Sequence, residues 1–298
     1  MGTLASINRC LRRLHINIPV TSIERSLYLL FHPKAKKDLK LNKRFKDIHK
    51  GERCFIVGCG PSINVQDLTL LKNEYVFTVN QLSRRHDFED INSNYHLWSD
   101  ARFFDIDPNK PEDQEMFEVI KKSKNNNPDQ CIFYTYALKG FVEDNGLKDE
   151  NSFYFGESGL YKPNDYLKFD MSKQLPGFST VIHYAICMAM YMGFKEIYLL
   201  GCDCTGFITT AQAKMKDWNK EILYGYNISN SEKKRLEKSN SKYSIENELS
   251  FYVDIFKTYS ELYKKAKKKG IDIYNATEGG LLESIPRVDY NSLFGNQG

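Results

Sequence analysis

The chain has 298 residues, of which 41% are hydrophobic and 27% charged, and its formal net charge is +4. This length is sufficient for one large α/β domain with a substantial core, so neither disulfides nor a metal is needed to explain folding. The apolar run at residues 27–31 is too short to cross a bilayer. Arginines interrupt the apolar residues of the first twenty positions, so we expect no signal peptide.

Seven cysteines, an odd number without the dense spacing of a secreted scaffold, favour a reducing compartment. The pair Cys202 and Cys204 has no second cysteine pair or histidine cluster beside it, which favours inert thiols over a metal site. We therefore expect a cytoplasmic protein.

Positive charge is concentrated at the N-terminus. Residues 1–50 hold twelve Lys and Arg against three acidic residues, which is 12 − 3 = +9 and leaves 4 − 9 = −5 for the remainder. We predict a basic helical N-terminal extension at residues 1–50 and a Rossmann-like nucleotide-binding domain at residues 51–298. Residues 1–48 can lie peripherally on an anionic inner-membrane surface, or dock on their own domain or a neighbouring subunit of a homo-oligomer. No basic groove with interleaved aromatic residues is visible, so no nucleic-acid partner is expected.

Strands and helices alternate along the rest of the chain. Apolar runs predict strands at residues 53–57, 75–79, 95–98, 130–136, 194–200 and 271–274, and helical patterns occupy residues 63–71, 112–124, 179–192 and 248–269. Residues 139–174 read as irregular, residues 206–247 as an inserted helical lid, and a final short helix is expected to open at residues 275–280. This order predicts an α/β, Rossmann-like fold with a mostly parallel sheet and flanking helices.

Polar residues follow the predicted strands, at the edge where open parallel sheets bind ligands. They are Gly58, Cys59, Gly60, Pro61 and Ser62 after the first strand, Asn80 and Gln81 after the second, Ser99 and Asp100 after the third, Gly201 and Asp203 after the fifth, and Glu278 after the last. Glycines let a backbone approach a ligand, and a helix beginning after Pro61 would offer unpaired N–H groups to an anion. The spacing is neither GxGxxG nor a Walker loop, so an ordinary tight corner stays open as an alternative.

Several further residues carry two interpretations each. Ser179 and Thr180 can cap a helix or bind an anion at its N-terminus, and His183 can be a packed core residue or an acid–base group. Tyr224, Tyr226 and Tyr243 in the lid read as surface aromatics, with donation of hydroxyls to a phosphate as the alternative.

Four segments carry a family resemblance: "FIVGCGPSI", "VFTVNQ", "GFKEIYLLGCD" and "YNATEGGLLESIPRVD". They resemble the 6-hydroxymethylpterin diphosphokinase MptE-like family, whose bacterial members commonly belong to surface-glycan gene sets. More distantly they resemble the sialyltransferases of glycosyltransferase family 42, which use CMP-sialic acid without a metal.

The second resemblance implies that the turn at residues 58–62, Asn80 and Gln81 contact the cytidine nucleotide. It implies Ser99 near the ribose and Ser179 and Thr180 near the sugar carboxylate. The chain departs from that pattern at Cys59 and Ser99, which replace asparagines, and residues 206–247 contain no histidine to act as general base. The candidates for that base are Asp203, His183 and Asp100, with Asp203 first because it ends a strand beside the glycine turn.

The resulting expectation is a bacterial glycosyltransferase of surface-polysaccharide assembly. It would transfer a sialic acid or Kdo type of sugar, with inversion, from a CMP-activated donor to a glycan or lipid-linked glycan acceptor, and would need no cofactor. The alternatives are a Mg-dependent pyrophosphokinase of the hydroxymethylpterin type, with Asp100, Asp105 and Asp203 as metal ligands, and a noncatalytic nucleotide-binding protein of glycan assembly.

Overall fold

A computed structural model of the protein describes residues 20–124, 127–160, 169–215, 224–234 and 244–295. Its centre is an eight-stranded sheet in the order β6-β5-β4-β3-β2-β1-β7-β8, in which every neighbouring pair of strands is parallel. The strands are β1 (Arg53–Val57), β2 (Tyr75–Val79), β3 (Tyr95–Trp98), β4 (Cys131–Thr135), β5 (Ser152–Leu160), β6 (Gln174–Gly177), β7 (Glu196–Leu200) and β8 (Asp272–Asn275). The predicted Rossmann-like α/β fold is confirmed.

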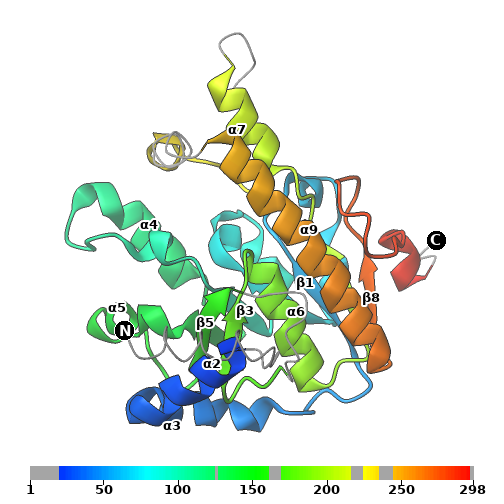
Figure 1. Ribbon diagram of the computed structural model, residues 1–298. Helices are drawn as coiled ribbons and strands as arrows, with labels where there is room; N and C mark the ends of the chain where they lie inside the picture. The colour runs from blue at the N-terminus through cyan, green and yellow to red at the C-terminus, as the bar shows by residue number, and fades with distance from the viewer. Residues whose placement is uncertain (1–19, 125–126, 161–168, 216–223, 235–243, 296–298) are drawn as a thin grey trace.

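Both faces of the sheet are covered, which explains why its strands are nearly continuous apolar runs. Along β1, Cys54 and Ile56 join the core beneath α6 (Val181–Met192) and α9 (Ile245–Lys268), while Phe55 and Val57 join the opposite core. The opposite face packs against α4 (Pro111–Lys122), α5 (Lys139–Asp144) and short 3-10 helices (Figure 1). All residues of α6 are buried, as its apolar composition predicts.

Three predicted elements are wrong. The α-helix expected at residues 63–71 is replaced by two 3-10 helices, Pro61–Asn64 and Leu68–Leu71, because Asp67 Oδ1 accepts hydrogen bonds from the N–H and hydroxyl of Thr69 and caps the second one. The stretch read as irregular, residues 139–174, contains α5 and β5 and ends at the first residue of β6, a strand that was not predicted. Residues 275–280 run without a helix, and the last helical turn is Asn291–Phe294.

The basic N-terminal segment folds into α2 (Val20–Phe31), α3 (Pro33–Lys40) and the 3-10 helix Leu41–Phe45. Leu39 is fully buried over β5, where a Cβ on Gly156 would lie 2.7 Å from its Cδ1 atom. Asn42 Nδ2 donates to the carbonyls of Tyr154 at 2.8 Å and Met171 at 2.9 Å. The segment from α3 onward is therefore docked on its own domain. The boundary predicted at residue 50 stays a prediction.

The predicted lid region begins with α7 (Gly206–Lys214) and leads into α9. Residues 216–223 and 235–243, with Tyr243, lie outside the described residues. Tyr226 is only 9% exposed, so its interpretation as a surface aromatic is wrong. Within the described ranges, no helix is both long enough and apolar enough to cross a membrane.

Candidate functional site at the carboxyl edge of the sheet

The carboxyl ends of all eight strands meet at one edge of the sheet because the strands are parallel. Strands β2 to β6 lie on one side of β1, whereas β7 and β8 lie on the other, so the strand order reverses between β1 and β7. Open α/β sheets bind ligands at such a reversal. The glycine turn, residues 58–62, and the turn at residues 201–203 lie there.

The two turns interlock through their backbones. Gly58 N donates to Leu200 O at 2.8 Å, and Gly60 N donates to Gly201 O at 3.0 Å. A Cβ on Gly60 would stand 2.6 Å from Gly201 O, and Gly201 itself has a φ of +62°. These glycines are therefore required by the close approach of two chain segments, independently of any ligand.

Asp203 accepts hydrogen bonds from Ser62, in the turn that the sequence suggests as a binding site for an anion. Its Oδ1 accepts from Ser62 N at 3.1 Å and its Oδ2 from Ser62 Oγ at 2.8 Å, and the residue is only 7% exposed. Burial raises the pKa of Asp203, although the bonds from Ser62 act in the opposite direction. The carboxylate thus ties the glycine turn to the end of β7. The α-helix expected after Pro61 is a single 3-10 turn.

Asn80 and Ser99 come together at the ends of β2 and β3. Asn80 has a φ of 44°, in the left-handed region that asparagine tolerates, and its Oδ1 accepts from Ser99 N at 3.4 Å. Both residues are half-buried, whereas Gln81 is 1% exposed. Cys59 Sγ donates to Val79 O at 3.4 Å, and burial raises the pKa of this thiol to about 12. Cys59 is therefore a neutral thiol in the turn.

Helix α6 begins at the same edge. Thr180 is its N-cap, with Oγ1 accepting from Ile182 N at 3.4 Å, so the predicted capping is confirmed. Ser179 and Thr180 remain half-buried at the helix N-terminus, where backbone N–H groups and the helix dipole favour an anion.

Glu157 is a titratable residue at this edge that the sequence analysis missed. It lies on β5, accepts from Thr135 Oγ1 at 3.2 Å, and also accepts from the hydroxyl of Tyr184 on α6. Tyr184 Oη in turn accepts from Phe178 N at 2.8 Å, which connects the carboxylate to the loop before Ser179. Burial raises the pKa of Glu157. A glutamate inside the aromatic strand "SFYFGESGL" was the available signal.

The remaining predicted residues do not converge on one point. His183 is fully buried against the rings of Phe178 and Tyr259, neither ring nitrogen has a hydrogen-bond partner among the described residues, and burial lowers its pKa to about 3. The Asp100 side chain is 20% exposed, and its Oδ2 forms an ion pair with Arg102 Nη2 at 2.6 Å. Glu278 is exposed beyond β8.

The fit of these side chains to a metal is poor. Asp100 is held by Arg102 and Asp203 by Ser62, and no three acidic, histidine or cysteine side chains converge anywhere in the described ranges. A magnesium ion bound by Asp100, Asp105 and Asp203 together would need these contacts to be broken.

The parallel sheet and the glycine turn at its reversal point define a Rossmann-like α/β protein. The chain belongs to the 6-hydroxymethylpterin diphosphokinase MptE-like family, whose profile matches residues 32–206. No curated protein sequence matched the chain.

Among solved structures, the chain is similar to the sialyltransferase CstII from Campylobacter jejuni in complex with cytidine-5'-monophosphate. The two share 17% identity over 81% of this chain and 86% of that chain, with a TM-score of 0.43. It is also similar to the monofunctional alpha-2,3-sialyltransferase Cst-I from Campylobacter jejuni, with 15% identity over 80% of each chain and a TM-score of 0.47.

Proposed function

We propose that this protein is an inverting glycosyltransferase of bacterial surface-glycan assembly that uses a CMP-activated acidic sugar. The observation that carries the proposal is the pairing of Asn80 with Ser99 beside the glycine turn, at the reversal point of the sheet. The amide of Asn80 and the hydroxyl of Ser99 offer donors and acceptors to a base and ribose. Ser179 and Thr180 at the N-terminus of α6 suit the sugar carboxylate.

The chemistry follows from these groups. An acceptor hydroxyl attacks the anomeric carbon, the bond from that carbon to the phosphate oxygen breaks, and CMP leaves with the electron pair. Asp203 is engaged by Ser62 and His183 is buried, so we assign the acceptor's proton to Asp100, which adjoins Ser99 and reaches solvent. The side chain of its partner Arg102 is 61% exposed, so this ion pair lies at the surface.

The direct test is release of CMP from CMP-sialic acid or CMP-Kdo in the presence of a glycan acceptor and a metal chelator. Asp100→Asn should lower kcat at least about 100-fold, the usual contribution of a general base, with unchanged affinity for CMP. Asp90→Asn, at an exposed carboxylate outside the proposed site, is the control. Absence of both CMP release and CMP binding would refute the proposal.

The family match favours one second candidate, pyrophosphoryl transfer from ATP to a pterin alcohol. The two functions differ in a simple measurement. Thermal stabilisation by CMP in the presence of EDTA supports the glycosyltransferase, and stabilisation by ATP only with magnesium supports the pyrophosphokinase. Stabilisation by CMP without turnover of any donor would indicate a noncatalytic nucleotide-binding protein.

A lipid-linked acceptor would require the protein to reach a membrane, and we extend the proposal to peripheral binding at the inner-membrane surface. Residues 30–52 carry eight Lys and Arg against three acidic residues, or 8 − 3 = +5, and all eight cationic side chains are exposed. Two apolar side chains of the same segment are also exposed, Phe31 at 74% and Leu41 at 56%. Cations interleaved with apolar side chains suit an anionic lipid surface, where each cation contributes about 1 kcal/mol to the binding free energy.

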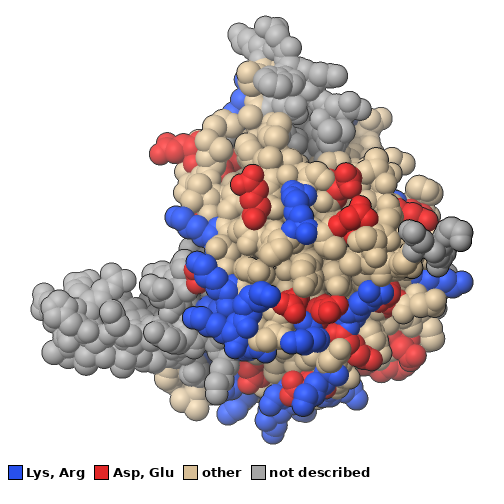
Figure 2. All heavy atoms as spheres, turned by 90° about the vertical axis from the view of Figure 1, so that its right-hand side faces the viewer, with Lys and Arg blue, Asp and Glu red and all other residues tan. Residues whose placement is uncertain are grey.

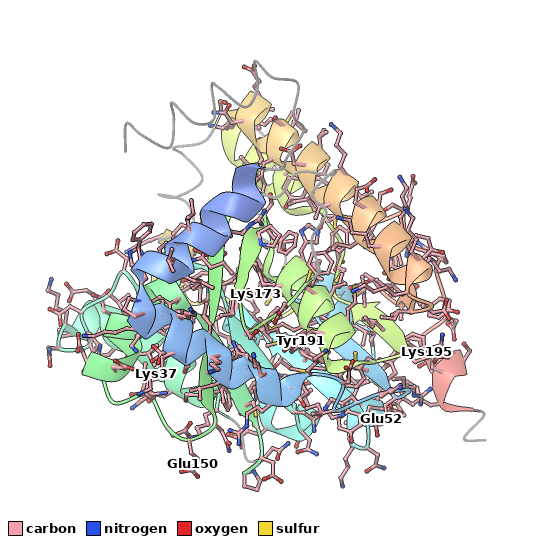
Figure 3. The ribbon with its side chains drawn as sticks, turned by 60° about the horizontal axis from the view of Figure 1, so that its bottom comes forward. Lys37, Glu52, Glu150, Lys173, Tyr191 and Lys195 are labelled. Carbon is pink, nitrogen blue, oxygen red and sulfur yellow. The ribbon has the colours of Figure 1, made fainter. Side chains whose placement is uncertain are left out.

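The same side of the molecule carries further lysines. Figure 3 shows Lys37 on α3 together with Lys173 and Lys195, interspersed with Glu52 and Glu150. Lysine and arginine side chains, with acidic ones between them, also gather low on the neighbouring face (Figure 2).

Co-sedimentation with phosphatidylglycerol vesicles tests this part of the proposal. A Lys37, Lys40 and Lys43 triple change to Glu should abolish sedimentation, whereas the same change at the exposed Lys72, Lys110 and Lys121 should not. Equal sedimentation of both variants, or equal binding to neutral phosphatidylcholine, would contradict it. Point changes are preferable to truncation because Leu39 and Asn42 belong to the packed domain.

A further inference from the structure

Residues 224–232, which we call the strap, lie directly on the glycine turn. Gly225 N donates to Cys59 O at 2.9 Å, and Arg85 Nη1 donates to Gly225 O at 2.5 Å. A Cβ on Gly225 would stand 2.7 Å from Gly60 O, so no atom fits between the strap and the turn at this point. Tyr226 is buried here as well.

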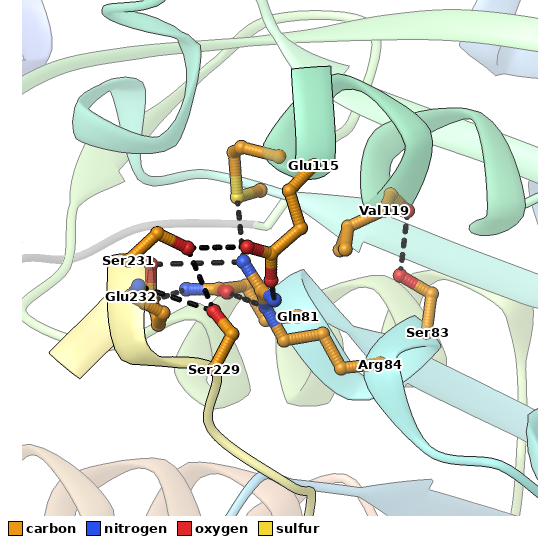
Figure 4. Close-up of polar contacts among 9 residues, drawn as sticks. Gln81, Ser83, Arg84, Glu115, Val119, Ser229, Ser231 and Glu232 are labelled. Carbon is orange, nitrogen blue, oxygen red and sulfur yellow. Dashed lines mark hydrogen bonds and ion pairs between the residues drawn. The ribbon is translucent and has the colours of Figure 1, made fainter. Parts of the chain in front are cut away.

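The far end of the strap engages the residues that follow β2. Glu232 is 2% exposed, and its Oε1 accepts from Gln81 Nε2 at 2.8 Å. The amide oxygen of Gln81, Oε1, accepts from Arg84 Nε, and Arg84 Nη2 lies 3.6 Å from Glu232 Oε2 (Figure 4). The side chain expected to contact a nucleotide is thus fully engaged by the chain itself.

Arg84 lies between two carboxylates. Its side chain is 6% exposed, its Nη1 is 2.5 Å from Glu115 Oε1, and Ser231 of the strap also donates to Glu115. An open hollow of about 640 Å³ adjoins it, lined by Ser83, Arg84, Glu115, Glu118, Val119, Lys122 and Asn227. A planar guanidinium binds carboxylate and phosphate through the same paired N–H groups. Glu232 therefore occupies a position that an anionic ligand can also take.

We propose that Arg84 binds the phosphate of the donor nucleotide and that Glu232 is an internal ligand which the phosphate must displace. The inference rests on the proposed function and adds to it a phosphate-binding residue and an autoinhibitory contact. A phosphate at Arg84 would meet electrostatic repulsion from Glu232 as long as the strap is in place. Displacement removes that repulsion and opens the strap from the glycine turn.

The experiment compares full-length wild type with Glu232→Gln by calorimetric titration with CMP and with cytidine, which lacks the phosphate. The glutamine retains the size of the side chain and an acceptor for Gln81 but removes the charge. We expect Glu232→Gln to bind CMP at least tenfold more tightly, equivalent to about 1.4 kcal/mol, with cytidine changed less than twofold. Glu150→Gln, which removes one exposed negative charge just before β5, at the amino edge of the sheet, should bind both as wild type does.

A second pair of measurements follows the strap and Arg84 separately. Trypsin should cleave after Lys233 or Lys234 faster in Glu232→Gln than in wild type, and CMP should accelerate cleavage of the wild type. Adding Arg84→Gln to Glu232→Gln removes both members of the ion pair and should abolish the gain in CMP affinity.

The outcomes separate the two claims. Binding of CMP that is unchanged or weaker in Glu232→Gln overturns the inference while the proposed function stands. An equal gain for cytidine and CMP overturns the assignment of the phosphate to Arg84. Failure of every variant to bind CMP overturns the proposed function and the inference together.

Discussion

Gly60→Ala tests whether the glycine turn is specified by the packing of two chain segments. The new Cβ would stand 2.6 Å from Gly201 O, a backbone atom that cannot move alone, and would collide with the Asp203 carboxylate. Overpacking of this kind costs about 1–3 kcal/mol, and loss of a charged hydrogen bond costs about 1.5–3 kcal/mol. We expect a loss of about 3–5 kcal/mol, or about 6–10 °C in Tm at about 2 °C per kcal/mol.

Gly140→Ala is the control for this substitution. Gly140 lies in α5, and a Cβ there would meet no atom within 4 Å. Alanine at this position should be neutral or stabilise by up to about 1 kcal/mol, since glycine is the poorer helix residue. Denaturant and thermal unfolding of both variants supply the comparison. If Gly60→Ala unfolds within about 1 kcal/mol of wild type, the turn is not held by Asp203 and Gly201 as described.

Three further predictions concern other residues of the edge. Burial raises the pKa of Glu157, so the stability contributed by its protonated carboxyl is complete below the unfolded pKa of about 4.3 and is lost as pH rises through the folded pKa. The Tm of Glu157→Gln relative to wild type should therefore increase from pH 4 to pH 8. A constant difference in Tm would contradict this. Burial lowers the folded pKa of His183 to about 3, so the wild type should lose stability relative to His183→Leu as pH falls below about 6.5, by up to about 1.4 kcal/mol per pH unit. Parallel curves of unfolding free energy against pH for the two proteins would exclude a buried neutral imidazole. Asn80→Ala should be about 1 kcal/mol less stable than Asn80→Gly, since both lose the bond with Ser99 and only alanine resists the left-handed backbone; equal unfolding midpoints would argue against a φ of 44°.

Strands and long helices were predictable because their signals are local. The runs that became β1, β2 and β3 are apolar and bounded by turn residues, and α6 is apolar on every side. Strands β5 and β6 were not predicted because glycine, proline and a glutamate interrupt their short apolar runs. Their pairing with β4 and with each other comes from distant parts of the chain, which a local pattern does not report.

The same distinction applies to the candidate site. Sequence order alone places Asn80 and Ser99 at neighbouring strand ends, and the structure brings them into contact. Nothing local predicts that Asp203 bonds to Ser62, 141 positions away, or that Glu232 bonds to Gln81 across 151 positions. Both contacts involve residues that the sequence suggests for ligand binding or catalysis, and both assign them partners within the chain.

The sequence by itself determined the fold class, the family and the edge of the sheet at which a ligand belongs. These follow from the alternation of strands and helices and from short motifs, which depend on neighbouring residues. Only the tertiary structure decided which polar groups at that edge remain available, because carboxylates from the turn after β7 and from the strap bind donors that follow β1 and β2. A buried donor or acceptor needs a partner, and which partner it finds depends on the packing of the whole chain.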